Sequence, residues 1–271
     1  MKPLLIILFL LTLASGSLAQ DTKFDAGAHS LALAKSNLLI RDAFSTLNSI
    51  AVFGSLKRTG VGVSFRNQFD LPENAVVSAA SIYHQRYFNI GVGFLRFGDE
   101  VFNYQRVSAA LGNRIGNVSL ALRLNRHQYA IENLGIQSLF SLDFGGTVHL
   151  GKNIILGTEV ENISRSRFNL DYQLPTVMRL GFQLNLQEQL TFQAELEKDI
   201  DSPAMLRGGV EYRLVDWLAI RGGLSSRPLM ATGGIGIIAG VLGVDYAFAN
   251  RSTLGEIHEI TLQIHLKTKE P

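Results

Sequence analysis

The sequence predicts an all-β fold: a transmembrane, antiparallel, up-and-down β-barrel of about 14 strands with a short N-terminal plug. Three observations support this fold class. The chain of 271 residues begins with a secretory-type leader, apolar residues recur at every second position over most of the remaining chain, and long and short connections alternate between these segments. An apolar content of 46% excludes a disordered polymer, and a formal net charge of +2 gives no electrostatic argument for a nucleic-acid partner.

Residues 1–19 have the features of a cleaved signal peptide. One lysine precedes an apolar core from Leu4 to Leu13, and small residues stand at Ser17 and Ala19. The core is about ten residues long, whereas a membrane-spanning helix needs about 20, so we expect cleavage after Ala19. The chain has no cysteine, which excludes disulfides, thiol chemistry and a lipoprotein-type leader.

Residues 20–59 are expected to form a separate N-terminal segment. Within it, apolar residues of 37–50 recur at helical spacing, which predicts a short helix before the first strand. This helix has two plausible places: inside the lumen as a plug, which we favour, or across the periplasmic mouth. A further strand over 50–57 is left open. The predicted plug residues are Leu39, Ile40, Ala43, Phe44, Leu47 and Asn48.

Residues 60–266 are expected to form the barrel, and residues 267–271 a periplasmic tail. The stretch RLGFQLNLQEQLTFQAELE, residues 179–197, is typical, because leucine and phenylalanine alternate with charged and amide side chains. The predicted strands are 60–69, 75–84, 87–97, 102–113, 116–127, 136–149, 153–163, 176–186, 189–199, 204–214, 217–225, 231–238, 241–249 and 256–266.

The length of these strands indicates that their apolar face contacts lipid. Strands of soluble sandwiches have about five or six residues, whereas a tilted membrane-spanning strand needs about 9–11, which fits the predicted segments. A barrel of about 14 strands also has a lumen too wide for an apolar filling. The longer connections, of which 164–175 is the longest, would lie outside the cell and the tight turns in the periplasm. The alternative is a soluble sheet with one solvated face.

The polar face predicts a ladder of opposite charges inside a wet lumen. Arginines and acidic residues nearly cancel, and they can pair across neighbouring strands. In a dry core each unpaired charge would cost several kcal/mol. The predicted ladder comprises Arg66, Arg123, Asp143, Glu159, Glu161, Arg179, Glu195, Glu197, Arg207, Glu211, Arg213, Arg221 and Asp245.

The uncharged stretch 228–244 resembles a membrane helix in its hydropathy. It contains five glycines, each costing about 1 kcal/mol in a helix, so we predict two strands around Gly240 instead. The simpler interpretation of the glycines is backbone packing and strand bending. A second is a smooth outer surface on which another barrel docks, formed by Gly234, Gly236 and Gly240.

Motifs of catalytic or metal sites are not found. The six histidines stand outside HExxH patterns, and no GxSxG motif occurs. Asp143 and Glu159 lie on adjacent predicted strands, but Arg123 beside them favours a structural ion pair over paired catalytic carboxylates. We therefore predict a protein that is not an enzyme and uses no cofactor and no metal.

Several short motifs resemble those of the FadL/PorV-like outer-membrane barrels, including the PorV and PorQ proteins associated with type IX secretion in Bacteroidota. The opening pattern of that family is partly present as Gly27, Ala28, Ala34, Ala43 and Asn48. His29 stands in place of arginine, the second glycine is replaced, and Ser49 and Ile50 stand in place of proline and alanine. Downstream, the likeness covers 174–176, 179–181, 195–199, 206–213, 220–224, 254–255 and 258–260.

The resemblance implies a barrel in the bacterial outer membrane with an N-terminal segment at or in its lumen. Its PorV/PorQ side implies a scaffold subunit that binds another envelope protein of a secretion system. Its FadL side implies a transporter of hydrophobic small molecules. The short predicted loops favour the scaffold, because uptake of the FadL type is expected to use long external loops for ligand capture. Expected partners are outer-membrane lipid, an envelope protein and, in the transporter alternative, a hydrophobic ligand.

Overall fold

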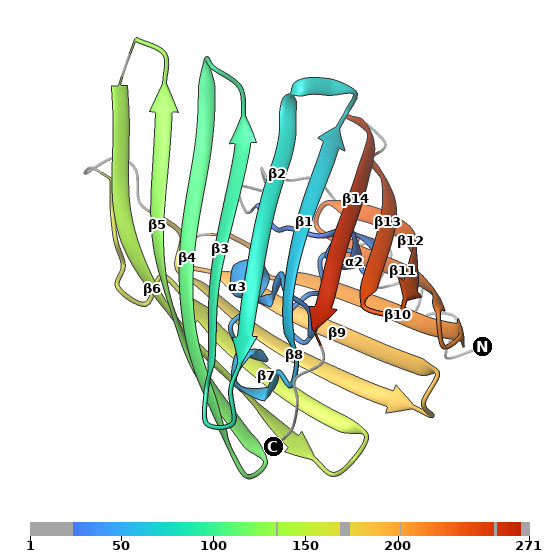
Figure 1. The fold of residues 1–271 in the computed structure, drawn as a ribbon. Coiled ribbons are helices and arrows are strands. Elements are labelled where there is room, and N and C mark those ends of the chain that lie inside the picture. The colour runs from blue at the N-terminus through green and yellow to red at the C-terminus, as the bar shows by residue number, and fades with distance from the viewer. Residues whose placement is uncertain (1–23, 134, 169–173, 201, 252–253, 267–271) are drawn as a thin grey trace, which may run out of the picture.

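The computed structural model describes residues 24–133, 135–168, 174–200, 202–251 and 254–266. They form one closed, antiparallel barrel (Figure 1). The predicted leader and tail lie outside the described residues. The strands are β1 (Thr59–Gln68), β2 (Leu71–His84), β3 (Asn89–Gly98), β4 (Phe102–Ile115), β5 (Val118–Ile131), β6 (Gly135–Leu150), β7 (Ile154–Glu161), β8 (Val177–Leu186), β9 (Leu190–Asp199), β10 (Met205–Val215), β11 (Leu218–Ser226), β12 (Leu229–Ala239), β13 (Leu242–Arg251) and β14 (Gly255–Leu266).

The barrel closes where β1 pairs with β14, from Thr59 opposite Leu266 to Gln68 opposite Ile257. This closure leaves no unpaired sheet edge. The predicted count of 14 strands is confirmed. Some predicted strands are too short at one end of the barrel. β2 begins at residue 71 instead of 75, and β5 continues to residue 131 instead of 127. The reason is that backbone pairing continues past the point where the apolar alternation stops.

The two ends of the barrel differ less than the sequence predicts. At the end we call the turn end, strands are joined through 85–88, 116–117, 151–153, 187–189, 216–217 and 240–241. At the opposite end, which we call the loop end, residues 162–176 form the long connection, between β7 and β8. Other segments that the sequence assigned to loops, such as 71–74, belong to strands.

The outer face of the barrel is apolar, as the strand pattern predicts. On β1, Val61, Val63 and Phe65 are 45%, 54% and 50% exposed, whereas Ser64 and Arg66 are buried on the inner face. The stretch 228–244 forms parts of β12 and β13, which confirms strands rather than a helix there. Within the described ranges, the helices are all too short or too polar to cross a bilayer.

The lumen is filled by residues 24–56, which we call the plug, drawn in blue inside the barrel in Figure 1. The plug contains α2 (Ala28–Ala32), α3 (Ser45–Asn48) and the 3₁₀ turn η1 (Phe53–Ser55). The helix predicted over 37–50 is wrong, since only the four residues of α3 are helical. The strand left open over 50–57 is also absent from this described segment. All six predicted plug residues are nevertheless buried.

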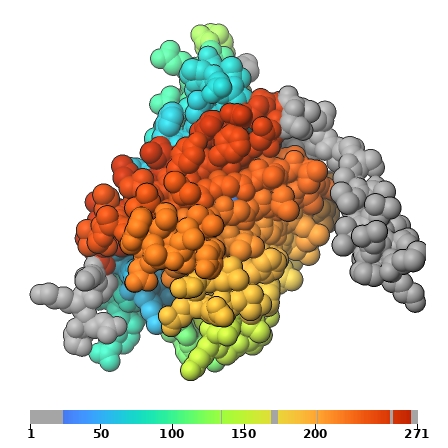
Figure 2. Space-filling view, turned by 90° about the vertical axis from the view of Figure 1, so that its right-hand side faces the viewer, coloured from blue at the N-terminus to red at the C-terminus, as the bar shows by residue number. Residues whose placement is uncertain are grey.

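Four apolar clusters attach the plug to the wall. Phe44 and Leu47 pack among inner residues of β2, β3 and β4, and α2 packs against β12, β13 and β14. The remaining clusters join Ile50 and Phe53 to β2, β4 and β5, and Leu39 to Ile155 of β7. Figure 2 shows β11 to β14 side by side as a continuous wall over one side of this core. The hydrophobic core of the molecule therefore lies between plug and wall.

Candidate functional site

The predicted charge ladder lies between the barrel wall and the plug. Arg123 Nε is 2.7 Å from Asp143 Oδ2, and its Nη2 is 3.0 Å from Glu159 Oε1. These contacts confirm that Asp143 and Glu159 form ion pairs with Arg123, as the sequence predicts. On β10, Arg207 Nη1 lies 2.8 Å from Glu197 Oε2. A chain of ion pairs thus crosses the inner face from β5 to β10.

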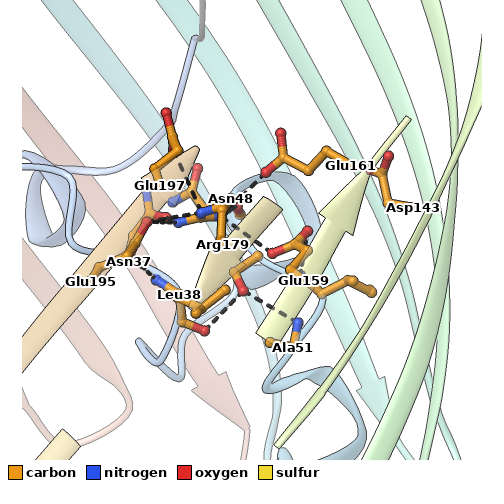
Figure 3. A network of polar contacts seen from close by, with 12 residues as sticks. Asn37, Leu38, Asn48, Ala51, Asp143, Glu159, Glu161, Arg179, Glu195 and Glu197 are labelled. Carbon is orange, nitrogen blue, oxygen red and sulfur yellow. Dashed lines mark hydrogen bonds and ion pairs between the residues drawn. The ribbon is translucent and has the colours of Figure 1, made fainter. Parts of the chain in front are cut away.

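Arg179 of β8 is the central residue of this chain (Figure 3). Its Nη2 lies 2.7 Å from Glu195 Oε1, and its Nη1 lies 3.2 Å from Glu159 Oε2. Glu161 is 3.3 Å from Nη1, and Glu197 is 3.7 Å from Nε. Four carboxylates from β7 and β9 therefore surround one fully buried guanidinium, and the register of β8 between these strands brings them together.

The arginines of the ladder also bind carbonyl groups of the plug. Arg123 donates from Nη1 to the carbonyl oxygen of Leu47 at 2.9 Å, and Arg106 donates to the same oxygen at 3.0 Å. Arg179 donates from Nη1 to the carbonyl oxygen of Asn48 at 2.8 Å. All three contacts lie at the C-terminal end of α3, where carbonyl groups have no partner within the helix. Positive charge is also favourable at that end of a helix.

The carboxylates of the ladder accept hydrogen bonds from amide groups of the plug. Glu195 Oε2 accepts from the N–H of Leu38 at 3.0 Å, and Glu159 Oε1 accepts from the N–H of Ile50 at 3.2 Å. Buried backbone groups need partners, and these side chains supply them where the plug is irregular. The prediction of a wet ladder is therefore wrong for the central residues, which are buried under the plug. Their contacts also explain why 37–50 folds without a long helix.

A second charged group joins the plug to β10, β11 and β13. Arg221 lies 2.7 Å from Glu211 and 2.5 Å from Asp245. His29 of α2 places Nε2 3.2 Å from Glu211 and Nδ1 3.5 Å from Asp42 of the plug. Burial and the charge of Arg221 act to lower the pKa of His29, but hydrogen bonds to Asp42 and Glu211 outweigh them and raise it to about 9.

A third charged group lies at the junction of β1 and β14. Arg66 of β1 contacts Glu259 of β14 at 2.8 Å and Asp25 of the plug at 3.0 Å. Glu259 also accepts the N–H of Gly27 at 2.7 Å. Burial acts to raise the pKa of Asp25, but the charges of Arg66 and Lys35 outweigh it and hold the pKa far below its ordinary value.

The 13 predicted ladder residues are divided among these three groups, with one exception. Eight belong to the central chain, Arg66 belongs to the β1–β14 junction, and Glu211, Arg221 and Asp245 belong to the His29 group. Arg213 lies 3.6 Å from Glu211, but its side chain is 58% exposed near the turn end.

Sequence reasoning missed several residues of these networks, among them Asp42, which binds His29, and Asn37, whose Oδ1 accepts a hydrogen bond from Arg179. Arg106 and Glu259 occupy inner positions of predicted strands, so the alternation could have found them. Asp25, His29 and Asn37 lie in the plug, where no periodic pattern signals a contact.

The glycines predicted to form an outer docking surface do not do so. A Cβ built on Gly234 would lie 2.6 Å from Cβ of Ala32 in the plug, and one on Gly236 would meet the side chains of Asp245 and Arg221. Both glycines therefore face the lumen, where the plug leaves no room for a side chain. Gly240 lies in the β12–β13 turn at φ 64°, a conformation that glycine adopts without strain.

Aromatic side chains gather at the loop end of β3, β4 and β5. The rings of Phe24 and Phe97 stack with centroids 4.3 Å apart, and Tyr104 lies 4.8 Å from Tyr129. Phe168, from the 162–176 connection, packs edge-on against Tyr129 at 4.9 Å. We call these five residues together with Phe102 the loop-end aromatic cluster. It joins the first described residue of the plug to the wall.

No protein-family model and no curated protein matches the sequence. Solved structures do match. A Pseudomonas aeruginosa FadL homologue aligns with a TM-score of 0.65 at 11% identity, over 90% of this chain and 98% of that one. The Pseudomonas putida toluene transporter TodX gives a TM-score of 0.65 at 10% identity, over 89% and 96% of the two chains.

A third solved structure, the Ralstonia pickettii toluene transporter TbuX, aligns with a TM-score of 0.61 at 12% identity. The alignment covers 89% of this chain and 97% of that one. The closed barrel of 14 strands agrees with this similarity. The chain therefore has the fold of the FadL-type outer-membrane barrels.

Proposed function

We propose that the protein is a channel for hydrophobic small molecules in the bacterial outer membrane, with residues 24–56 as the plug that closes its lumen. The apolar outer face suits a lipid environment. Since short turns of bacterial barrels lie in the periplasm, the turn end is assigned to the periplasm and the loop end to the outside. The solved structures with this fold include proteins described as toluene transporters, which supports the transporter over the scaffold.

The observation that carries this proposal is the loop-end aromatic cluster. Its rings line the side on which a compound from outside would arrive, and the plug lies directly next to them through Phe24. Aromatic faces bind apolar and aromatic compounds by stacking and area burial. Fourteen strands and a filled lumen alone would fit a closed structural barrel equally well.

The scaffold function predicted from the PorV/PorQ-like motifs has lost the docking surface proposed for it. Its docking surface required Gly234 and Gly236 on the outer face, but both lie against groups inside the barrel. The short loops that favoured it remain, although one connection, 162–176, contributes Phe168 to the aromatic cluster. We therefore propose the transporter alone.

Uptake of radiolabelled toluene into vesicles carrying the refolded protein tests the proposal. We expect faster initial uptake than in protein-free vesicles, and a loss of about fivefold in Phe97→Ala, equivalent to about 1 kcal/mol of aromatic contact. Phe94→Ala is the matched control, because Phe94 is on the same strand but faces outward. Uptake equal to that of protein-free vesicles, or equal losses in both variants, would contradict the proposal.

A further inference from the structure

Below the plug, the turn end of the lumen contains an open cavity of about 800 Å³, which we call the turn-end vestibule. Its lining includes Arg41, Lys57 and Arg58 of the plug and its linker to β1, Arg114 of β4 and His149 of β6. Apolar side chains of β10, β11 and β12 line the other side. The vestibule therefore has one basic wall and one mixed wall, in which these apolar side chains stand among the charged side chains of Glu211, Arg213, Asp216, Arg221 and Asp245.

The basic wall carries charges that no acidic side chain balances. Within the described residues, no salt bridge joins Arg41, Lys57, Arg58 or Arg114 to a carboxylate. The acidic residues of the same cavity have other partners. Asp42 binds His29, and Glu211 and Asp245 bind Arg221. Asp216 completes the acidic lining. It lies in the β10–β11 turn, across the barrel from β4 in the strand order.

The imidazole of His149 adds a hydrogen-bond donor to this wall. Arg41 Nη2 lies 3.1 Å from Nε2 of His149, and because a guanidinium only donates, Nε2 must accept and Nδ1 must carry the proton. This Nδ1 is buried and makes no hydrogen bond of good geometry, although the backbone of Asn117 lies near enough to act on the ring. The charges of Arg41, Arg114 and Lys57 all act on this ring. The wall thus presents mainly hydrogen-bond donors.

Like charges here face each other across the contact between plug and wall. Arg41 belongs to the plug and Arg114 to β4. Enclosure in the lumen, followed by the charge of Arg114, lowers the pKa of Arg41. Arg114 uses its Nε to donate to the carbonyl oxygen of Gly116 at 2.8 Å, which leaves its terminal nitrogens available. An anion placed between the two guanidiniums would replace their repulsion with two charge-assisted hydrogen bonds.

We infer that the turn-end vestibule binds an oxyanion, a phosphate or carboxylate group, held by Arg41, Arg114, Lys57 and Nδ1 of His149. The group bridges plug and wall, and the apolar side chains of β10, β11 and β12 in the same cavity accommodate a short hydrocarbon part when the oxyanion is the headgroup of an amphiphile. This site is separate from the loop-end aromatic cluster and does not depend on transport, so failure of the uptake experiment leaves it untouched.

Calorimetric titration of the full-length protein in an uncharged detergent tests the site, with inorganic phosphate and hexyl phosphate as probes at constant ionic strength. We expect saturable binding whose Kd rises about tenfold or more in Arg41→Gln and in Arg114→Gln, because each removes a charge-assisted hydrogen bond. Binding of inorganic phosphate identifies a free oxyanion as sufficient. Binding of hexyl phosphate alone identifies an amphiphile headgroup.

Arg86→Gln is the matched control. Arg86 lies in the β2–β3 turn at the same end of the barrel, with its guanidinium 5.6 Å from the Tyr87 ring centroid and outside the vestibule lining. The Kd of the Arg86→Gln variant for either probe should stay within about twofold of that of the wild type. Absence of saturable binding for both probes, an unchanged Kd in the Arg41 and Arg114 variants, or an equal loss in Arg86→Gln would overturn the inference. Far-UV circular dichroism establishes that each variant is folded.

Discussion

The buried charged side chains between plug and wall stabilise the structure by pairing with other buried polar groups, which would otherwise have no partner. A buried ion pair alone is weak evidence of stability, since desolvation offsets its Coulomb energy. Arg179, however, contacts four carboxylates and also donates to the backbone of the plug. Removing such a residue leaves several buried acceptors without partners, which lowers the stability of the folded protein far more than loss of an exposed ion pair.

Arg179→Met is therefore expected to lower the free energy of unfolding by about 3–5 kcal/mol, as for other broken buried ion pairs. Urea unfolding of the refolded protein, followed by tryptophan fluorescence, measures this. Arg213→Met serves as the control, because Arg213 is largely exposed and its exposed ion pair contributes little. Similar unfolding curves for wild type and Arg179→Met would show that the network contributes no net stability.

His29 gives the attachment of the plug a predictable pH dependence. Its pKa is raised from the ordinary value of 6.5 to about 9, so the contribution of protonated His29 is fully present below about pH 6.5. It is lost as the pH rises through about 9. We expect the plug to become more sensitive to protease between about pH 7 and about 10, measured by limited proteolysis with the barrel intact. A His29→Gln variant that keeps the same pH dependence would contradict this assignment.

At the scale of the element, the strands could be predicted from the sequence, whereas for the plug only its burial and not its backbone conformation could be predicted. Strands bury one face and expose the other, so Leu180, Phe182 and Leu184 alternate with glycine or polar residues and reveal the period. The plug is surrounded by the barrel wall, and its backbone hydrogen bonds go to side chains far away in sequence, as from Leu38 to Glu195. The apolar spacing of 37–50 therefore predicted burial correctly and helix incorrectly. For the same reason, no pattern in the sequence near Asp25 indicates that it pairs with Arg66.

Neighbouring glycines of β11 provide a test of how the plug fits the wall. A Cβ on Gly223 would collide with the backbone of Leu33 and would lie 2.5 Å from the N atom of Ala34, whereas a Cβ on Gly222 would face outward with its nearest atom at 3.8 Å. Gly223→Ala should displace 33–34 and increase proteolysis of the plug, while Gly222→Ala should not. Circular dichroism checks that both variants keep their strands. Equal proteolysis of the two variants would show that the plug tolerates the added methyl group.

For the whole molecule, the central question is whether the plug moves during function. Ala32 of the plug and Gly234 of β12 are close enough for a cross-link, because a Cβ on Gly234 would be 2.6 Å from that of Ala32. A small shift would bring two cysteines there to the Cβ separation of a disulfide, about 3.8 Å. The chain has no other cysteine, so the bond would be unique.

We expect the oxidised Ala32→Cys/Gly234→Cys protein to lose toluene uptake and to regain it on reduction, because a fixed plug keeps the lumen filled. Uptake before and after addition of a reductant measures this, and each single-cysteine variant serves as a control. Equal uptake in the oxidised and reduced double variant would mean that compounds cross without movement of α2.

The contacts of Arg66 and Glu259 have a consequence for biogenesis. These residues stand on the first and last strands, and both bind the segment from Asp25 to Gly27. The junction of β1 and β14 is thus completed by a third segment, which precedes both strands in the sequence. We therefore expect closure of the barrel and binding of this N-terminal segment to be coupled, so that an assembly intermediate in which β1 and β14 are unpaired also has an unbound N-terminal segment.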